Sequence, residues 1–189
     1  MPRTSGPRRP RARVPDPVRR ATDGPRDSMG GLRYIESSAV VAALLERDAR
    51  ARQAIRAGGR RVTSALTFAE AARALVRARV AGRLTAEREQ AARRALERLE
   101  RRCTVVAVSD AVLGRVGRTY PMEPVRTLDA VHLATAEIVA PRPQALTLVT
   151  LDDRVRSNAR ALGYLVEPEQ PAVRPHARRP GRHAFRHRV

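Results

Sequence analysis

The stretch "LRYIESSAVVAALLE", residues 32–46, changes from a strand pattern to a helix pattern at one acidic residue. Its first four residues are bulky and mostly apolar, whereas the residues after Ser38 favour an amphipathic helix. Glu36 stands at the change and is followed by Ser37 and Ser38. One interpretation is a helix cap, with Ser37 or Ser38 as the capping residue. The other is that Glu36 is a metal ligand, and the stretch alone favours the cap.

The same alternation of strand and helix patterns recurs along the chain. The predicted strands are Leu32–Ile35, Arg61–Ser64, Thr104–Val108, Leu146–Thr150 and Tyr164–Val166. The predicted helices are Ser37–Glu46, Asp48–Ala57, Thr67–Ala81, Thr85–Arg101, Asp110–Thr119, Thr127–Val139 and Asp152–Leu162. Strands that alternate with helices of this length indicate an α/β fold, in which helices cover both faces of a parallel sheet of about five strands.

The chain of 189 residues has room for one domain, which we place at residues 31–168. The flanking segments 1–30 and 169–189 are rich in Pro and Arg, show no periodicity, and are predicted to be disordered. Met29 directly precedes the first strand and is a candidate for the natural start. The basic tail is interpreted either as a solvated segment or as a nonspecific nucleic-acid arm.

The basic residues are all arginine, so a mechanism that needs a lysine amine is excluded. Segments 1–30 and 169–189 contain 14 Arg and 4 acidic residues, which is about half of the net charge of +19. The predicted domain still has 24 Arg against 15 acidic residues. This excess favours a polyanionic partner, and a solvated arginine surface is the alternative.

Cys103 is the only cysteine, which excludes an internal disulfide and favours a reducing cytoplasm. No apolar run approaches the length of about 18 residues that would span a bilayer, so no membrane partner is expected. The first residues lack the apolar segment of a secretory signal.

Four acidic residues follow predicted strands or begin predicted helices: Glu36, Glu70, Asp129 and Asp152. The carboxyl ends of parallel strands open on one edge of the sheet, where ligands bind. Carboxylates gathered there repel one another, and oxygen ligands without a Cys or His pair favour Mg²⁺ or Mn²⁺. We therefore interpret the four acids as a metal site.

Each acid also has a structural interpretation. Glu70, predicted in about the first turn of its helix, is placed to form an ion pair with Arg73. Asp129 and Asp152 lie where the helix macrodipole favours acids. His132 follows Asp129 by three residues and is expected to be a packing or substrate-facing residue rather than a ligand.

Four segments in this order resemble the PIN-domain family, and within it the VapC-type ribonuclease toxins. They are "YIESSAVVAALL", "TSALTFAEAARAL", "RTLDAVHLATA" and "LVTLDDRVRSNARALG", and the resemblance spans roughly Leu32 to Pro168. It implies a three-layer α/β/α fold and a catalytic, metal-binding set of Glu36, Glu70, Asp129 and Asp152. Ser38 and Thr150 are implied as supporting hydroxyls. Asp152 is preferred to its neighbour Asp153 because it stands two residues after Thr150.

The resemblance also implies a function, namely a Mg²⁺- or Mn²⁺-dependent endoribonuclease that cleaves RNA phosphodiester bonds. Its expected partners are an RNA substrate, a small antitoxin protein that blocks the site, and a second copy in a homodimer. The family usually has Asp where this chain has Glu36, and the extra methylene moves the carboxylate by about 1.5 Å.

Two other functions are left open by the residues. The first is a catalytically silent PIN-like module that binds RNA or a partner, which the longer Glu36 side chain favours. The second is a phosphoacceptor receiver-like domain, which the absence of lysine disfavours.

Overall fold

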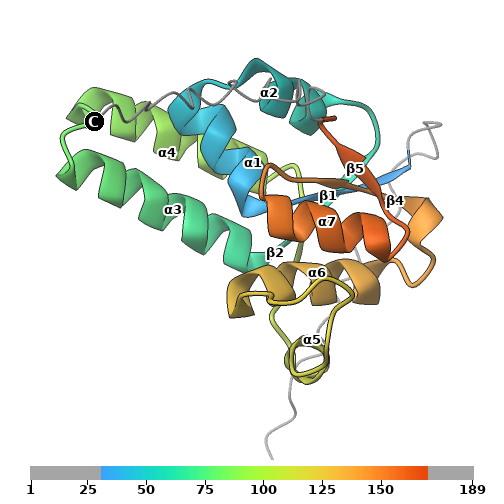
Figure 1. The fold of residues 1–189 in the computed structure, drawn as a ribbon. Coiled ribbons are helices and arrows are strands. Elements are labelled where there is room, and N and C mark those ends of the chain that lie inside the picture. Colours follow the sequence, from blue (N-terminus) through green and yellow to red (C-terminus); the bar gives the residue numbers. More distant parts are fainter. Residues whose placement is uncertain (1–30, 170–189) are drawn as a thin grey trace, which may run out of the picture.

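The computed structural model describes residues 31–169, and within them five parallel strands form one sheet in the order β3-β2-β1-β4-β5 (Figure 1). The predicted tails 1–30 and 170–189 lie outside the described residues. The strands are β1 Leu32–Ile35, β2 Arg60–Ser64, β3 Thr104–Val106, β4 Leu146–Val149 and β5 Leu165–Glu167. The predicted α/β class with about five parallel strands is therefore confirmed.

Seven α-helices flank the sheet in this part of the chain. They are α1 Ser37–Val41, α2 Ala49–Arg56, α3 Ala65–Val80, α4 Ala86–Glu100, α5 Asp110–Val116, α6 Thr127–Val139 and α7 Asp153–Ala161. A π-helical turn at Ala42–Glu46 continues α1, and a 3-10 turn at Pro143–Ala145 precedes β4. None of the described helices is long and apolar enough to cross a membrane.

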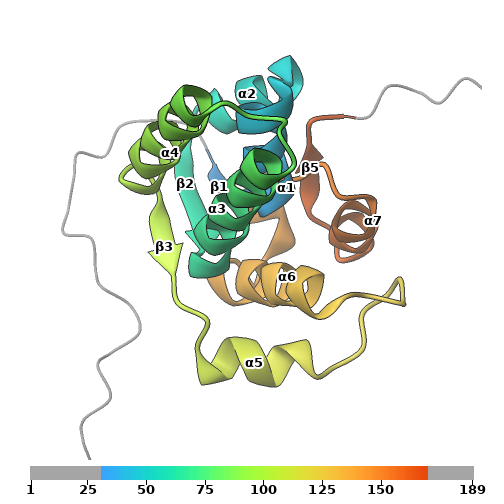
Figure 2. The ribbon, with the colours of Figure 1, turned by 90° about the vertical axis from the view of Figure 1, so that its left-hand side faces the viewer.

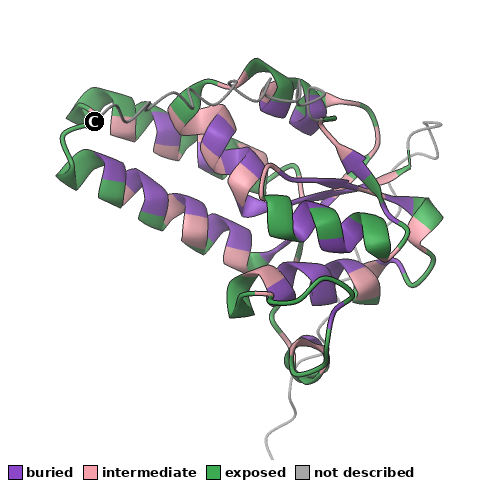
Figure 3. Ribbon diagram, viewed as in Figure 1, coloured by how far each residue is buried: buried purple, intermediate pink, exposed green. Residues whose placement is uncertain are grey.

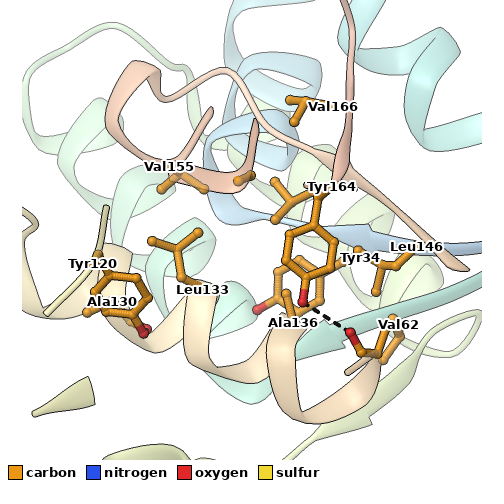
Figure 4. Packing of buried hydrophobic residues seen from close by; sticks show 13 residues of the cluster. Tyr34, Val62, Tyr120, Ala130, Leu133, Ala136, Leu146, Val155, Tyr164 and Val166 are labelled. Atoms are coloured by element: carbon orange, nitrogen blue, oxygen red, sulfur yellow. Dashed lines mark hydrogen bonds between the residues drawn. The ribbon is translucent and has the colours of Figure 1, made fainter. Parts of the chain in front are cut away.

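Side chains alternate between the two faces of the sheet and build a separate core on each side. On one face, Tyr34 and Leu148 pack against α6 and α7, as Figure 4 shows for the side chains around Tyr164. On the other face, the next residues along the strands, Ile35 and Val149, pack against α1, α2, α3 and α4. Figure 3 shows the helices burying the sides that face the sheet, which gives three layers.

Helix α5 lies outside these layers and packs on α6 (Figure 2). Its buried Val112 contacts Val131 and Ala134 of α6. The predicted Asp110–Thr119 helix was too long, because α5 ends at Val116, just before Gly117. The predicted Thr104–Val108 strand was also too long, since pairing with β2 stops at Val106.

The helix that carries Glu70 begins earlier than predicted. The Ser64 side chain accepts a hydrogen bond from the amide of Leu66, so Ser64 caps α3 and the helix begins at Ala65. Glu70 thus lies in the second turn, and its predicted position in about the first turn was wrong. The first turns of α1, α6 and α7 lie with this part of α3 at the carboxyl edge of the sheet (Figure 1).

Candidate functional site

Glu36 ends β1, caps α1, and is 3 % exposed. Its Oε1 accepts hydrogen bonds from the Ser37 hydroxyl at 2.6 Å and the Ser38 amide at 3.0 Å. Its Oε2 accepts from the Thr150 hydroxyl at 2.8 Å and from the Ser38 hydroxyl. Glu36 itself is therefore the cap of α1, so the expectation that Ser37 or Ser38 would cap this helix was wrong. The role of Glu36 as a metal ligand stays a prediction.

Ser38 and Thr150 join the start of α1 to the end of β4. The Ser38 Oγ accepts hydrogen bonds from the amides of Leu151 at 2.8 Å and Asp152 at 3.0 Å. The Thr150 Oγ1 accepts a second, longer bond from the Asp152 amide at 3.1 Å. Asp152 in turn caps α7, because its Oδ1 accepts from two amides of the first turn at 2.8 and 3.0 Å. The two predicted hydroxyls thus link Glu36 to the backbone of Asp152.

Glu70 is connected to the candidate site by a hydrogen bond with His132. The Nε2 of His132, in α6, lies 2.7 Å from Glu70 Oε2 and 3.7 Å from Glu36 Oε1. The other ring nitrogen, Nδ1, lies 2.9 Å from the Tyr34 hydroxyl. One ligand atom each of Glu36, Glu70 and His132 falls within 4.8 Å of the others. Glu70 therefore pairs with His132, whereas the ion pair with Arg73 considered from sequence does not form among the described residues.

Asp129 lies in the first turn of α6, and its Oδ2 is buried without a hydrogen-bond partner within residues 31–169. Burial raises the pKa of Asp129, and the negative charges of Asp152 and Glu36 raise it further. The charge and backbone of Arg126 offset this only in part. One oxygen of the Asp129 carboxylate is thus without a hydrogen bond, although the carboxylate bonds to the backbone of Arg126, and it lies in the electrostatic field of two other acids.

The Glu70–His132 contact shifts both pKa values toward the charged forms. Burial alone would raise the pKa of Glu70, but the hydrogen bond and charge of His132 lower it. Burial alone would lower the pKa of His132, but the hydrogen bond to Glu70 and the charge of Glu36 raise it. This is the pattern of a charge-assisted hydrogen bond.

The arginines that dominate the composition do not neutralise this site. In the described part of the chain, no arginine forms an ion pair with any of the four predicted acids, although Arg33, Arg79, Arg93 and Arg115 all pair with other glutamates. The unpaired Asp129 Oδ2 and the mutual repulsion of the acids fit a divalent cation, and an oxygen-rich donor set is the kind that Mg²⁺ or Mn²⁺ prefers.

The roles of three residues of the site were not predicted from the sequence. Ser37 donates to Glu36, Tyr34 contacts His132, and His132 is buried between two acids. For His132 and Tyr34, the sequence contains a pattern that could have indicated these roles. His132 lies one helical turn after Asp129, and Tyr34 lies in the strand that Glu36 directly follows.

The sequence is similar to known proteins over most of its length. The model of the PIN domain family matches residues 33–161. Ribonuclease VapC46 of Mycobacterium tuberculosis is 39% identical over 135 residues, which cover 70% of this chain and 94% of that protein. Ribonuclease VapC35 of the same species is 36% identical over 137 residues, which cover 70% of this chain and 93% of that protein.

Two solved structures have a related chain path. One is a toxin–antitoxin complex from Klebsiella pneumoniae, with a TM-score of 0.44 and 22% identity over 63% of this chain and 85% of that one. The other is VapBC-1 from nontypeable Haemophilus influenzae, with a TM-score of 0.46 and 15% identity over 72% of this chain and 96% of that one.

Proposed function

We propose, from the premise that this chain belongs to the PIN-domain family, that it is a metal-dependent endoribonuclease and the toxin of a type II toxin–antitoxin pair. Its relatives at 36 to 39% identity are named as VapC ribonucleases, and the alignments cover at least 93% of their length. The proposed reaction is hydrolysis of an RNA phosphodiester bond at the carboxyl edge of the sheet.

One observation carries this proposal: the buried, unpartnered Oδ2 of Asp129 beside the like charges of Asp152 and Glu36. A buried anionic oxygen without a partner costs free energy, and a bound cation would supply the missing partner. Glu36, Glu70, Asp129 and Asp152 would hold the ion. A divalent cation at such a site supplies an activated water and neutralises developing charge on the phosphate.

The remaining residues keep this arrangement in place and attract the substrate. Ser38 and Thr150 hold Glu36 against the start of α7. Arg126 beside Asp129 and Arg154 at the first turn of α7 are exposed. We propose that they hold the RNA backbone, because arginine binds phosphate with two parallel hydrogen bonds.

The partners follow from the same family relation. A small antitoxin is proposed to cover the acidic site, and a homodimer is proposed as the assembly. Co-expression with the short reading frame beside the gene, followed by size-exclusion chromatography and light scattering, tests both. The proposal expects one complex that contains both proteins and no cleavage activity until the antitoxin is removed.

The activity is tested with purified protein and a panel of transfer and ribosomal RNAs, with Mg²⁺ or with EDTA. Cleavage is expected with Mg²⁺ or Mn²⁺ and is expected to stop in EDTA. The control is Asp129→Asn, which keeps the shape of the side chain and removes its charge. Cleavage that persists in EDTA, or in Asp129→Asn, would show that the metal-dependent mechanism is wrong.

A second candidate, a catalytically silent RNA- or partner-binding module, is favoured by the hydrogen bonding of Glu36. Its carboxylate already accepts four hydrogen bonds, which is about its full capacity. A cation would have to displace one donor, and the Ser37 hydroxyl is the one free to rotate away. RNA binding without cleavage, together with no Mn²⁺ binding by calorimetry, would favour this candidate.

A further inference from the structure

His132 is held at both ends inside the protein, although it carries no role in the four-acid site. Its side chain is 1 % exposed. It lies in α6 and contacts Glu70 of α3 through Nε2 and Tyr34 of β1 through Nδ1. One imidazole ring therefore connects three elements that are distant in sequence.

The contacts decide where the proton lies. Nε2 faces a carboxylate at 2.7 Å, and an ionised carboxylate can only accept, so Nε2 must be protonated. In the neutral ring, Nδ1 then accepts from the Tyr34 hydroxyl at 2.9 Å. Tyr34 thus favours the tautomer that presents Nε2–H to Glu70. An Nε2 that donates to Glu70 has no lone pair left for a metal.

Glu70 needs such a partner more than Glu36 does. The Glu36 side chain is 4 % exposed and has four donors, whereas the Glu70 side chain is 24 % exposed. The charge of Arg77 also attracts Glu70, and its other side-chain partner is the Ser37 hydroxyl, which Glu36 also binds. Without the histidine, a side chain with three rotatable bonds would turn toward solvent.

We propose that His132 is a positioning residue that holds the Glu70 carboxylate beside Glu36, with Tyr34 fixing the orientation and tautomer of the ring. The inference rests on the proposed function, because it assigns Glu70 to the cation. Hydrogen-bonding partners of metal ligands affect metal affinity typically by about 10- to 100-fold. His132 is expected to act on metal affinity in this range.

Two isosteric variants separate this role from simple packing. In His132→Gln, the amide nitrogen stands near the position of Nε2 and can still donate to Glu70. In His132→Asn, the amide stands near Nδ1 and reaches only Tyr34. Calorimetry with Mn²⁺ and no RNA is expected to show affinity lowered about 10- to 100-fold in His132→Asn. His132→Gln is expected to stay within about threefold of wild type, since its amide replaces the Nε2–H donor.

The opposite results identify which idea is wrong. Equal losses of Mn²⁺ affinity in the two variants, at equal thermal midpoints, would overturn the positioning role while the metal site stands. If the wild-type protein binds no Mn²⁺, the metal site itself is wrong and the positioning role falls with it.

Nitrogen NMR of the wild-type protein gives a readout that does not depend on the metal affinity of the variants. The ring signal missing from His132→Gln belongs to His132. It is expected to show a protonated Nε2 both in EDTA and with saturating Mg²⁺. Loss of that proton on adding Mg²⁺ would make His132 a direct ligand and overturn the proposal.

Discussion

Two carboxylates of this protein, the buried Glu36 in the candidate site and the half-buried Glu137 in α6, are stabilised in opposite ways. Glu137 pairs with Arg115 of α5, with Nε 2.5 Å and Nη2 3.0 Å from its two oxygens. The same guanidinium lies 4.1 Å from the centre of the Tyr120 ring. Glu36 has only amide and hydroxyl donors at hydrogen-bonding distance, and His132 lies 3.7 Å away.

We interpret the difference as one between a carboxylate with a structural role and a carboxylate proposed to bind a ligand. An arginine cancels the charge of Glu137 and fastens α5 to α6. Neutral donors hold Glu36 in position but leave its negative charge in place, and Asp129 and Asp152 add to it. In a chain with 24 arginines in its central part, the lack of arginine ion pairs at this edge is informative.

The largest expected effect comes from neutralising each carboxylate in turn. Glu36→Gln is expected to abolish cleavage, with a loss of at least about 100-fold, because removing a charged group from a catalytic site typically costs this much. Glu137→Gln is expected to leave cleavage unchanged and to lower the free energy of unfolding by about 2 kcal/mol, because Arg115 loses its partner. Cleavage assays and urea titrations measure the two effects.

The opposite effects of Glu36→Gln and Glu137→Gln would contradict this difference between the two carboxylates. If Glu137→Gln abolished cleavage at unchanged stability, the Arg115–Glu137 pair would belong to the function. If Glu36→Gln retained full activity, a carboxylate bonded only by neutral donors could not be inferred to bind a ligand.

Asp129→Asn extends the comparison, because Asp129 Oδ2 has neither a hydrogen bond nor an ion pair among the described residues, whereas Glu137 Oε2 has the ion pair with Arg115. Its Mn²⁺ affinity is expected to fall by at least about 10-fold, since one charged ligand is lost. The thermal midpoint in EDTA is expected to be equal to wild type or higher, because the change removes repulsion from Asp152 and Glu36. Calorimetry measures the Mn²⁺ affinity, and a thermal melt in EDTA measures the midpoint. A lower midpoint in EDTA would show that Asp129 has a structural partner.

Alkaline titration compares the same two regions through their tyrosines. Burial raises the pKa of Tyr120 and of Tyr164 to about 12, and it raises the pKa of Tyr34 well above its ordinary value. A raised pKa in the folded state gives stability that is complete below pH 10 and is lost as the pH rises above it. Tyrosinate absorbance is therefore expected together with loss of helical circular dichroism. Full ionisation near pH 10 in a folded protein would contradict these shifts.

The smallest expected effect is that of Glu36→Asp, which restores the residue usual in the family. Cleavage is expected to be preserved or raised, because the carboxylate remains and retreats by about 1.5 Å. Initial rates at saturating Mg²⁺ measure it, with Glu137→Asp as the matched control outside the site. A loss as large as that of Glu36→Gln would mean that the four donors around Glu36 require the longer side chain.

The fold was predictable because alternation and helical periodicity are local signals. Helix α6 and strand β1 were predicted to the residue. Errors arose where tertiary contacts decide an end. Strand β3 ends where its pairing with β2 ends, and α3 begins at Ala65, after the Ser64 cap, rather than at Thr67.

The sequence allowed the residues at this edge of the sheet to be predicted, but not the hydrogen bonds between them. Topology brings the carboxyl ends of β1 and β4 together, so Glu36 and Thr150 were expected at one edge. The bond from His132 to Glu70 spans 62 residues and that from Tyr34 to His132 spans 98, and no local pattern reports such contacts. Whether the four acids hold a metal stays a prediction.

The pairing of β1 with β4 also affects when the site can form during synthesis of the chain. Glu36 directly follows the first described strand, yet its Thr150 donor lies 114 residues later. During synthesis, β1 is complete long before β4 exists, so an emerging chain has Glu36 without the end of β4 beside it. The assembled edge is therefore among the last features to form. The proposed RNA-cutting site would then assemble only after β4 has been synthesised.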